Sequence, residues 1–408
     1  MPDATWAAWE HISGALEKPA GRYVQIALDI ATDDPLRTPR VRGLRVEAGP
    51  APAAWTSTLR VLEARKADIV RTSVPFEYEP FDHPKLNALR QEHRLDEVVK
   101  GARGEFERIT RLAAWASKRW ESGHLREAYP PWDALEILKA HPDGKPVGGF
   151  CQQYNIVFLQ ACESFGISGR AVSIGPGDHG LRTRGGHEVV EVWSNEHAKW
   201  VYVDGNTAWY LADEETGTPL SLLELRERQL QTHRGEKVRA VRAVELAPSN
   251  VEGLAKTRHV WKGLADWPPF AELRLIPRSN FLEQPAPLPL NQGMRGWFWT
   301  GHHVWTDAAS SASLLYANRV SRRGDFEWTL NQAGITLEAL EAKGEIRVHL
   351  ETVTPAFDTF LASTDGGKKK PVTTGFVWTL HPGRNSLEVV SRNIAGVEGP
   401  PSRVVIER

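Results

Sequence analysis

A cysteine stands at the predicted start of a helix, in the segment Gly148-Gly149-Phe150-Cys151. The helix is predicted to run from Cys151 to Phe165, and Gly166 suits the position just after its end. The first backbone N–H groups of a helix have no partner within the helix and lie at the positive end of its dipole. Because a thiolate and a developing oxyanion are both stabilised there, Cys151 is a candidate nucleophile.

The helix dipole alone does not make a reactive cysteine. Its effect is about 0.3–1 kcal/mol, which is less than one pKa unit. A thiolate at neutral pH therefore needs a cationic partner such as a protonated histidine. The alternative role for a cysteine is packing, since cysteine is among the most buried residue types. Cys162 fits this alternative, because it lies about 16 Å along the helix from Cys151, too far for a disulfide.

A predicted β-hairpin supplies the histidine and a carboxylate. Strand patterns on either side of a loop at 194–197 place His187 directly opposite Asp204. Directly opposed residues have Cβ atoms about 4.5–5.5 Å apart, so Asp204 could orient the imidazole. A slip of one residue would put the two side chains on opposite faces of the hairpin. The sequence thus predicts a triad of Cys151, His187 and Asp204.

The order of these residues resembles the transglutaminase-like branch of the papain-like superfamily. The resemblance spans about residues 106–209 and is carried by the segments 149–154, 166–172, 186–188 with Trp193, and 199–204. It implies that Cys151 is the nucleophile, His187 the general base and acid, and Asp204 the orienting carboxylate. Where the family commonly has His-Ala-Trp and Asp-Pro, this sequence has His187-Glu188-Val189 and Asp204-Gly205-Asn206. Both differences alter the rim of the cleft, so the family's substrate preferences do not transfer.

Other residues are candidates for contacts with a substrate. Trp132, upstream of the nucleophile, could form a wall of the site or donate to an oxyanion, and Tyr154 lies one helical turn after Cys151. The loop 175–186 contains His179, Arg182 and Arg184, which suit either a solvated basic loop or a cleft edge that recognises an anion. We expect no metal and no cofactor, since no Cys-x-x-Cys or His-Glu-x-x-His spacing is present.

The predicted fold class is α+β, with several domains in a chain of 408 residues. Residues 1–95 are a β-rich region with the pattern of a partial jelly roll, and 96–275 are the papain-like, transglutaminase-like core. Residues 276–325 are a connecting segment rich in Trp and Pro. Strand patterns with frequent turn signals make 326–408 an immunoglobulin-like β-sandwich.

Charge and hydropathy restrict the partners. The chain has 50 Lys and Arg against 51 Asp and Glu, so nucleic acid and membranes are poor default partners. Its apolar runs are shorter than the roughly 18–20 residues of a membrane span, and its start lacks the pattern of a signal peptide. The flanking sandwiches favour an exported bacterial protein with its leader absent from this numbering and a native chain that extends further N-terminally. Two cysteines that do not bridge permit any compartment.

Three functions are open from the sequence. The first is thiol-dependent acyl transfer, either amide hydrolysis or transamidation, on a peptide, another amide or a glycan-linked substrate. The second is a lyase or hydrolase acting on an acidic polysaccharide, with Tyr154, His179, His187 and Arg182 or Arg184 as its candidates. The third is a non-catalytic binding protein that retains the triad as a relic. The oligomeric state and the identity of the substrate stay open.

Overall fold

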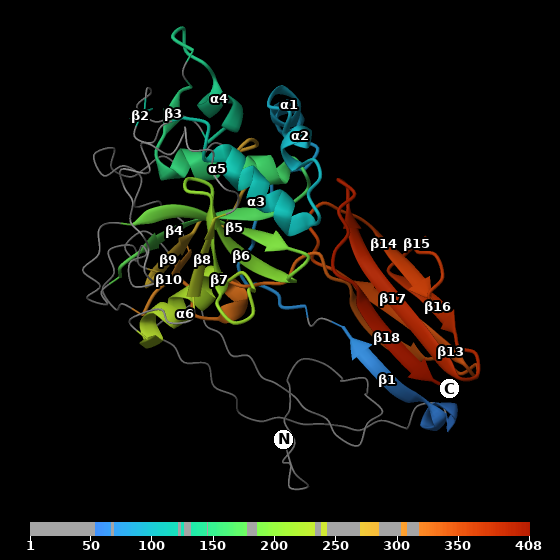
Figure 1. The fold of residues 1–408 in the computed structure, drawn as a ribbon. Coiled ribbons are helices and arrows are strands. Elements are labelled where there is room, and N and C mark those ends of the chain that lie inside the picture. Colours follow the sequence, from blue (N-terminus) through green and yellow to red (C-terminus); the bar gives the residue numbers. More distant parts are fainter. Residues whose placement is uncertain are drawn as a thin grey trace.

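The computed structural model describes residues 54–66, 69–120, 124–125, 132–144, 146–177, 186–232, 238–242, 270–284, 303–307 and 318–408. It is a mixed α/β structure, consistent with the predicted α+β class. A central sheet carries helices, and two further sheets lie beside it (Figure 1). Of the region predicted as a partial jelly roll, residues 1–53 lie outside the described residues.

The α-helices of the described residues are between five and 13 residues long. They are α1 (Pro84–Glu92), α2 (Leu95–Val99), α3 (Glu105–Ala116), α4 (Ala134–Leu138), α5 (Cys151–Glu163) and α6 (Leu222–Thr232), with 3-10 turns η1 (Ala54–Thr58) and η6 (Arg323–Asp325). Helix α4 begins at Ala134, because the Asp133 side chain caps it by accepting from two backbone N–H groups. The helix predicted at 151–165 is α5, which ends two residues early, with Gly166 in the left-handed region.

The central sheet has the strand order β11-β10-β9-β4-β5-β6-β7-β8. Its strands are β4 (Gly169–Gly175), β5 (His187–Ser194), β6 (Lys199–Asp204), β7 (Trp209–Asp213), β8 (Val238–Arg242), β9 (Glu272–Leu275), β10 (His303–Trp305) and β11 (Asn318–Arg319). The structure thus places β10 and β11, which lie in the predicted connecting segment, at the edge of this sheet. A short antiparallel pair consists of β2 (His124–Leu125) and β3 (Gly148–Gly149), of which β3 ends just before α5.

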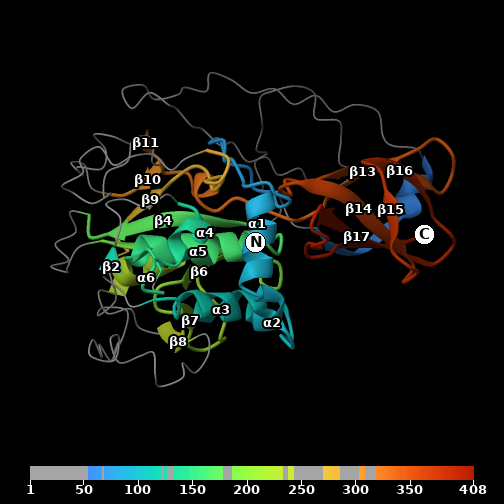
Figure 2. The same cartoon turned by 90° about the horizontal axis from the view of Figure 1, so that it is seen from above.

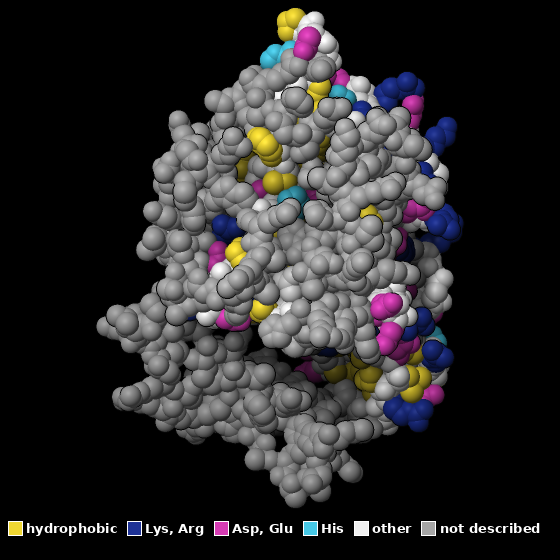
Figure 3. Space-filling model, turned by 60° about the vertical axis from the view of Figure 1, so that its left-hand side comes forward, with side chains coloured by type: hydrophobic (Ala, Val, Ile, Leu, Met, Phe, Trp, Pro, Cys, Tyr) yellow, Lys and Arg dark blue, Asp and Glu magenta, His cyan; other side chains and the backbone are white. Residues whose placement is uncertain are grey.

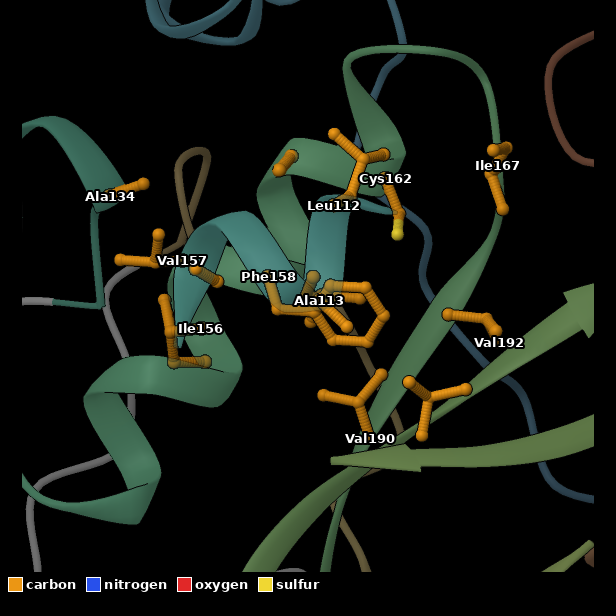
Figure 4. Close-up of a cluster of buried hydrophobic side chains, with 14 of the residues drawn as sticks. Leu112, Ala113, Ala134, Ile156, Val157, Phe158, Cys162, Ile167, Val190 and Val192 are labelled. Atoms are coloured by element: carbon orange, nitrogen blue, oxygen red, sulfur yellow. The ribbon is translucent and has the colours of Figure 1, made fainter. Parts of the chain in front are cut away.

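Helix α5 is buried along almost its whole length because it lies between the sheet and other helices (Figure 2). On one side it contacts β4 and β5, and on the others α1, α3 and α4. Figure 4 shows Phe158 and Cys162 among side chains from α3 and β5, including Leu112 and Val190. Cys162 is fully buried here, and burial raises the pKa of its thiol well above the usual value. This position agrees with the packing role predicted for it.

A second core lies on the other face of the sheet. It contains the hairpin tryptophans Trp193 and Trp200 together with α6 and the segment around Phe326 and Trp328. Arg170 is fully buried at its centre, and its guanidinium lies 4.0–4.8 Å from the ring centroids of Trp200, Phe326 and Trp328. This core joins the central sheet to the start of the C-terminal part.

The C-terminal part has two sheets that share one core. The five-stranded sheet has the order β1-β18-β17-β14-β15, and the three-stranded sheet has the order β12-β13-β16. The strands are β1 (Arg60–Arg65), β12 (Gly334–Ala339), β13 (Glu345–Glu351), β14 (Phe357–Thr364), β15 (Lys370–Val372), β16 (Gly375–Thr379), β17 (Arg384–Asn393) and β18 (Ser402–Glu407). That this sandwich is immunoglobulin-like stays a prediction.

The edge strand β1 comes from the predicted N-terminal region. It pairs antiparallel with β18, with Arg60 opposite Glu407, and appears in blue beside the red strands in Figure 1. The predicted N-terminal region 1–95 thus contains both β1, which pairs with the sandwich, and α1, which contacts α5, while its boundary at residue 95 stays a prediction. The described residues also contain no helix long and apolar enough to cross a membrane.

Buried acids lie where the extended segment before α1 meets the end of α5. Burial raises the pKa of Glu79 to about 7, and burial together with the nearby Glu79 raises that of Glu163 well above its usual range. In the unfolded chain a glutamate has a pKa of about 4.3. The stabilisation from protonated Glu79 is therefore complete below that pH and is lost as the pH rises through about 7.

Replacing Glu79 by glutamine should accordingly stabilise the protein more at pH 8 than at pH 5. We expect a difference on the order of 1 kcal/mol in the free energy of unfolding, after allowance for screening by solvent. Urea unfolding at the two pH values measures it. Glu341→Gln at an exposed turn of the sandwich is the control and should show no such difference. Equal effects of Glu79→Gln at both pH values would contradict the expectation.

Candidate active site

The backbone before α5 fixes the position of Cys151. Phe150 is the extended residue before the helix, and its N–H donates to Gln153 Oε1 over 2.9 Å. Gly149 has φ +147°, and a Cβ atom there would lie 2.4 Å from the Gln153 side chain. A glycine is thus required at this turn. Cys151 follows as the first helical residue and is partly exposed, with its own N–H among the unpaired donors of the helix start.

The rings of Trp120 and Tyr154 pack beside this turn and hold it by hydrogen bonds. Trp120 Nε1 donates to Gly149 O over 3.0 Å, and the Tyr154 hydroxyl donates to Trp120 O. The rings of Trp120 and Tyr154 stack with centroids 4.0 Å apart. Tyr154 is only 2% exposed. It therefore supports the segment that carries Cys151, and the structure does not place it where a substrate would touch it.

The β5–β6 hairpin differs from the predicted register by two residues. Trp193 pairs with Trp200 and not with Ala198, and the loop is 195–198. Ala198 closes this loop in the left-handed conformation, with φ +49°. A shift of two residues keeps the same faces, because side chains alternate along a strand with a period of two. His187 and Asp204 therefore still meet, as diagonal neighbours instead of directly opposed ones.

His187 lies between Asp204 and Cys151. Its Nε2 is 2.9 Å from Asp204 Oδ2, and the imidazole also makes a hydrogen bond with Cys151. Burial by itself would lower the pKa of His187, but the charges of Asp204 and of a Cys151 thiolate raise it well above its usual value. The arrangement thus favours the charged form of the imidazole, and the structure brings all three predicted triad residues together.

Asp204 is 2% exposed and is held by several donors. Oδ1 accepts from Asn206 N over 2.9 Å, and Oδ2 accepts from Thr207 Oγ1 over 2.6 Å in addition to its contact with His187. Burial alone would raise the pKa of this carboxyl, yet attraction to His187 and the hydrogen bonds hold it below its usual value. Asp204 is thus an ionised group of fixed orientation.

Sequence reasoning missed Asn155, which contacts all three parts of this site. It is fully buried in α5, one turn after Cys151, and its amide reaches both β5 and the end of β6. The available signal was a polar asparagine inside a helix whose other positions are mostly apolar. A buried asparagine needs partners for its amide, and in this helix the sequence does not show which ones they are.

Of the other residues predicted to contact a substrate, one is buried and three lie outside the described residues. Trp132 is 1% exposed and packs edge-to-face on Phe281, with ring centroids 4.8 Å apart, so it belongs to the core and does not form a wall of the site. His179, Arg182 and Arg184 lie outside the described residues. Figure 3 shows one side of the molecule, on which histidine and hydrophobic side chains of the described residues are visible in colour.

A group of possible metal ligands occurs away from the triad. Among the described residues, Glu79, His83 and Glu283 have ligand atoms within 4.8 Å of one another. His83 Nδ1 already accepts a hydrogen bond from Lys85 N at the start of α1. The Nε2 atom of the neutral ring therefore carries the proton, and a metal there would have to displace this cap. We assign no metal to the group.

The comparison with protein families agrees with this geometry. Residues 92–205 match the model of the transglutaminase-like superfamily. This segment is therefore similar to the transglutaminase-like superfamily, and we call it the transglutaminase-like domain. The match covers α3, α5 and the hairpin, and it therefore includes Cys151, His187 and Asp204. A search of curated proteins found no match to the chain.

The matched segment contains most of the layers around α5. Helix α5 begins at Cys151 and packs on β4 and β5 of the central sheet. The segments that flank the domain are rich in β-structure, as the sequence predicts. Beyond residue 205 the central sheet continues through β7 and β8, so the sheet extends past the matched segment.

Proposed function

We propose that the protein is a thiol-dependent acyl-transfer enzyme, with Cys151 as nucleophile, His187 as general acid and base, and Asp204 as the group that orients His187. The observation that carries the proposal is the geometry of His187. Its ring lies 2.9 Å from the buried Asp204 carboxylate through Nε2 and makes a hydrogen bond with Cys151 at the open start of α5. These are the contacts that activation of a thiol requires.

In the first half of the reaction the Cys151 thiolate attacks the carbonyl carbon of an amide. The electron pair of the carbonyl moves to oxygen, and the first N–H groups of α5 are positioned as donors to a negative oxygen there. The C–N bond then breaks as His187 gives its proton to the leaving nitrogen. An amine leaves, and the acyl group stays on sulfur as a thioester.

In the second half water or another amine attacks the thioester. His187, now neutral, accepts a proton from the attacking group, and the C–S bond breaks to restore the thiolate. Water gives hydrolysis, and an amine gives transamidation. Asp204 keeps the ring in one orientation throughout, and it stabilises the charge whenever the imidazole is protonated.

The two alternatives from the sequence have less support. The contact between Cys151 and His187 speaks against a relic triad, since a relic would not need to keep it. The polysaccharide reading depends on Tyr154, which is buried, and on loop residues outside the described ranges. Acyl transfer is therefore the one function that we propose.

Covalent labelling tests the proposal. Incubation with an activated acyl ester such as p-nitrophenyl acetate should release nitrophenolate in a burst and add one acetyl group to Cys151, detected by mass spectrometry of peptides. Cys162 is an internal control, because its buried thiol should stay unlabelled. In Cys151→Ala the burst should be absent. An undiminished burst in that variant, or labelling of Cys162 at an equal rate, would refute the proposed nucleophile.

A further inference from the structure

We propose that Asn155 is a positioning residue of the triad, which fixes Cys151, His187 and Asp204 relative to one another through one buried amide. The inference rests on the proposed function. Asn155 is fully buried and lies one helical turn after Cys151, on α5. Its side chain contacts the three chain segments that carry the triad, although it touches no reacting atom.

The donors of this amide reach all three segments. Nδ2 donates to Cys151 O over 3.0 Å in the first turn of α5 and to Glu188 O over 2.6 Å in β5, directly after His187. It also lies 3.3 Å from Asp204 Oδ1 at the end of β6. Since Nδ2 has two hydrogens, one of them is shared between acceptors. The oxygen, Oδ1, accepts from Gly205 N over 2.8 Å.

The surroundings allow one orientation of the amide. If the nitrogen and oxygen were exchanged, Oδ1 would face the carbonyl oxygens of Cys151 and Glu188 together with a carboxylate, while Nδ2 would face the N–H of Gly205. Acceptors would then meet acceptors, and a donor would meet a donor. The hydrogen bonds thus determine which amide atom is nitrogen and which is oxygen. Both atoms bond to segments that carry the triad.

This connection has a consequence for the geometry of catalysis. The thiol belongs to a helix, and the imidazole and the carboxylate belong to two strands, so small movements of α5 against the sheet would change the Cys151–His187 contact. Asn155 ties the helix start to both strands at the level of the triad. A displacement of about 1 Å between reacting groups can lower the rate about 100-fold, so hydrogen bonds that hold the helix start on the strands would matter for catalysis.

The pH dependence of alkylation tests the role directly. Second-order rates of reaction of Cys151 with iodoacetamide are measured between pH 5 and pH 9 by peptide mass spectrometry. In the native protein we expect the thiolate–imidazolium pair to hold the rate at pH 6 far above that of a free thiol. In Asn155→Ala the rate at pH 6 should fall at least tenfold, with less than a threefold change at pH 9, where a free thiol is itself ionised.

A second variant and a control keep the result interpretable. Asn155→Ser keeps a hydroxyl that can donate within the helix but cannot reach both strands, so it replaces the alanine variant if that one does not fold, and it should show the same loss at pH 6. Asn385→Ala removes an equally buried asparagine with three hydrogen-bond contacts in the sandwich, and it should leave the pH profile unchanged.

The outcomes separate this inference from the proposed function. A native protein whose alkylation follows an ordinary thiol, with half-reactivity near pH 8.5, would overturn acyl transfer by an activated Cys151. A native profile with reactivity at low pH, retained unchanged in folded Asn155 variants, would overturn only the positioning role. The same loss in Asn385→Ala would show that general destabilisation causes it, and would also overturn that role.

Discussion

Asp204→Asn is expected to lower the rate of acylation of Cys151 by about 10³–10⁴-fold while leaving the fold intact. The buried carboxylate accepts from His187 Nε2 over 2.9 Å and attracts the imidazolium. An asparagine of the same shape could satisfy Asn206 and Thr207, yet it carries no charge. Burial lowers the pKa of His187, and Asp204 and Cys151 raise it. Without the charge of Asp204 only Cys151 would oppose the effect of burial, so the pKa of His187 should fall.

Two measurements check this expectation. The burst of nitrophenolate from p-nitrophenyl acetate gives the acylation rate, and NMR titration of His187 gives the direction of its pKa change. Asp358→Asn is the matched control, since Asp358 forms an exposed ion pair with Arg392 over 2.7 Å in the sandwich. Its acylation rate should be unchanged. An Asp204→Asn variant that acylates within tenfold of the native rate would show that the carboxylate is not the orienting group.

Arg170→Met is expected to destabilise the protein by about 3–5 kcal/mol. Arg170 Nη2 lies 2.5 Å from Glu191 Oε2, and both side chains are completely buried. Removal of the guanidinium leaves the Glu191 carboxylate without its counter-charge, and burial already raises the pKa of that group. The loss also removes the cation from the faces of Trp200, Phe326 and Trp328.

A double variant distinguishes the lost charge pair from lost packing. In Arg170→Met with Glu191→Leu no charge stays buried, so much of the stability should return, although Glu191 also accepts from Leu222 N over 2.7 Å. Urea unfolding monitored by tryptophan fluorescence gives the three free energies of unfolding. If the single Arg170→Met variant were as stable as the native protein, the buried pair would not contribute as argued.

The proximity of Cys151, His187 and Asp204 could be predicted because each of these residues leaves a local signal. Cys151 follows the glycines that a helix start requires, and His187 and Asp204 lie on strands whose alternation is visible in the sequence. The exact register was wrong by two residues, since the length of a loop does not by itself determine which residues pair across it. The prediction of the pair survived because an even shift preserves the face.

Other features had no local signal. Asn155 can be recognised as part of the site only when the carbonyl of Glu188 and the N–H of Gly205 are seen beside it, and both are far away in the sequence. For the same reason the sequence does not show that Trp132 packs on Phe281, almost 150 residues later, which buries it in the core together with many other side chains. The pairing of β1 with β18 likewise joins segments that no spacing rule connects.

That pairing means that the sandwich is completed by residues on both sides of the transglutaminase-like domain along the chain. Arg60 lies opposite Glu407 and Arg65 opposite Arg403, so the outer ends of the two strands are neighbours. A force that pulled these ends apart would load the hydrogen bonds of β1 one after another, beginning at Arg60. Until the last of them opened, the tension would pass through the sandwich edge, and the helix that carries Cys151 would stay unstrained.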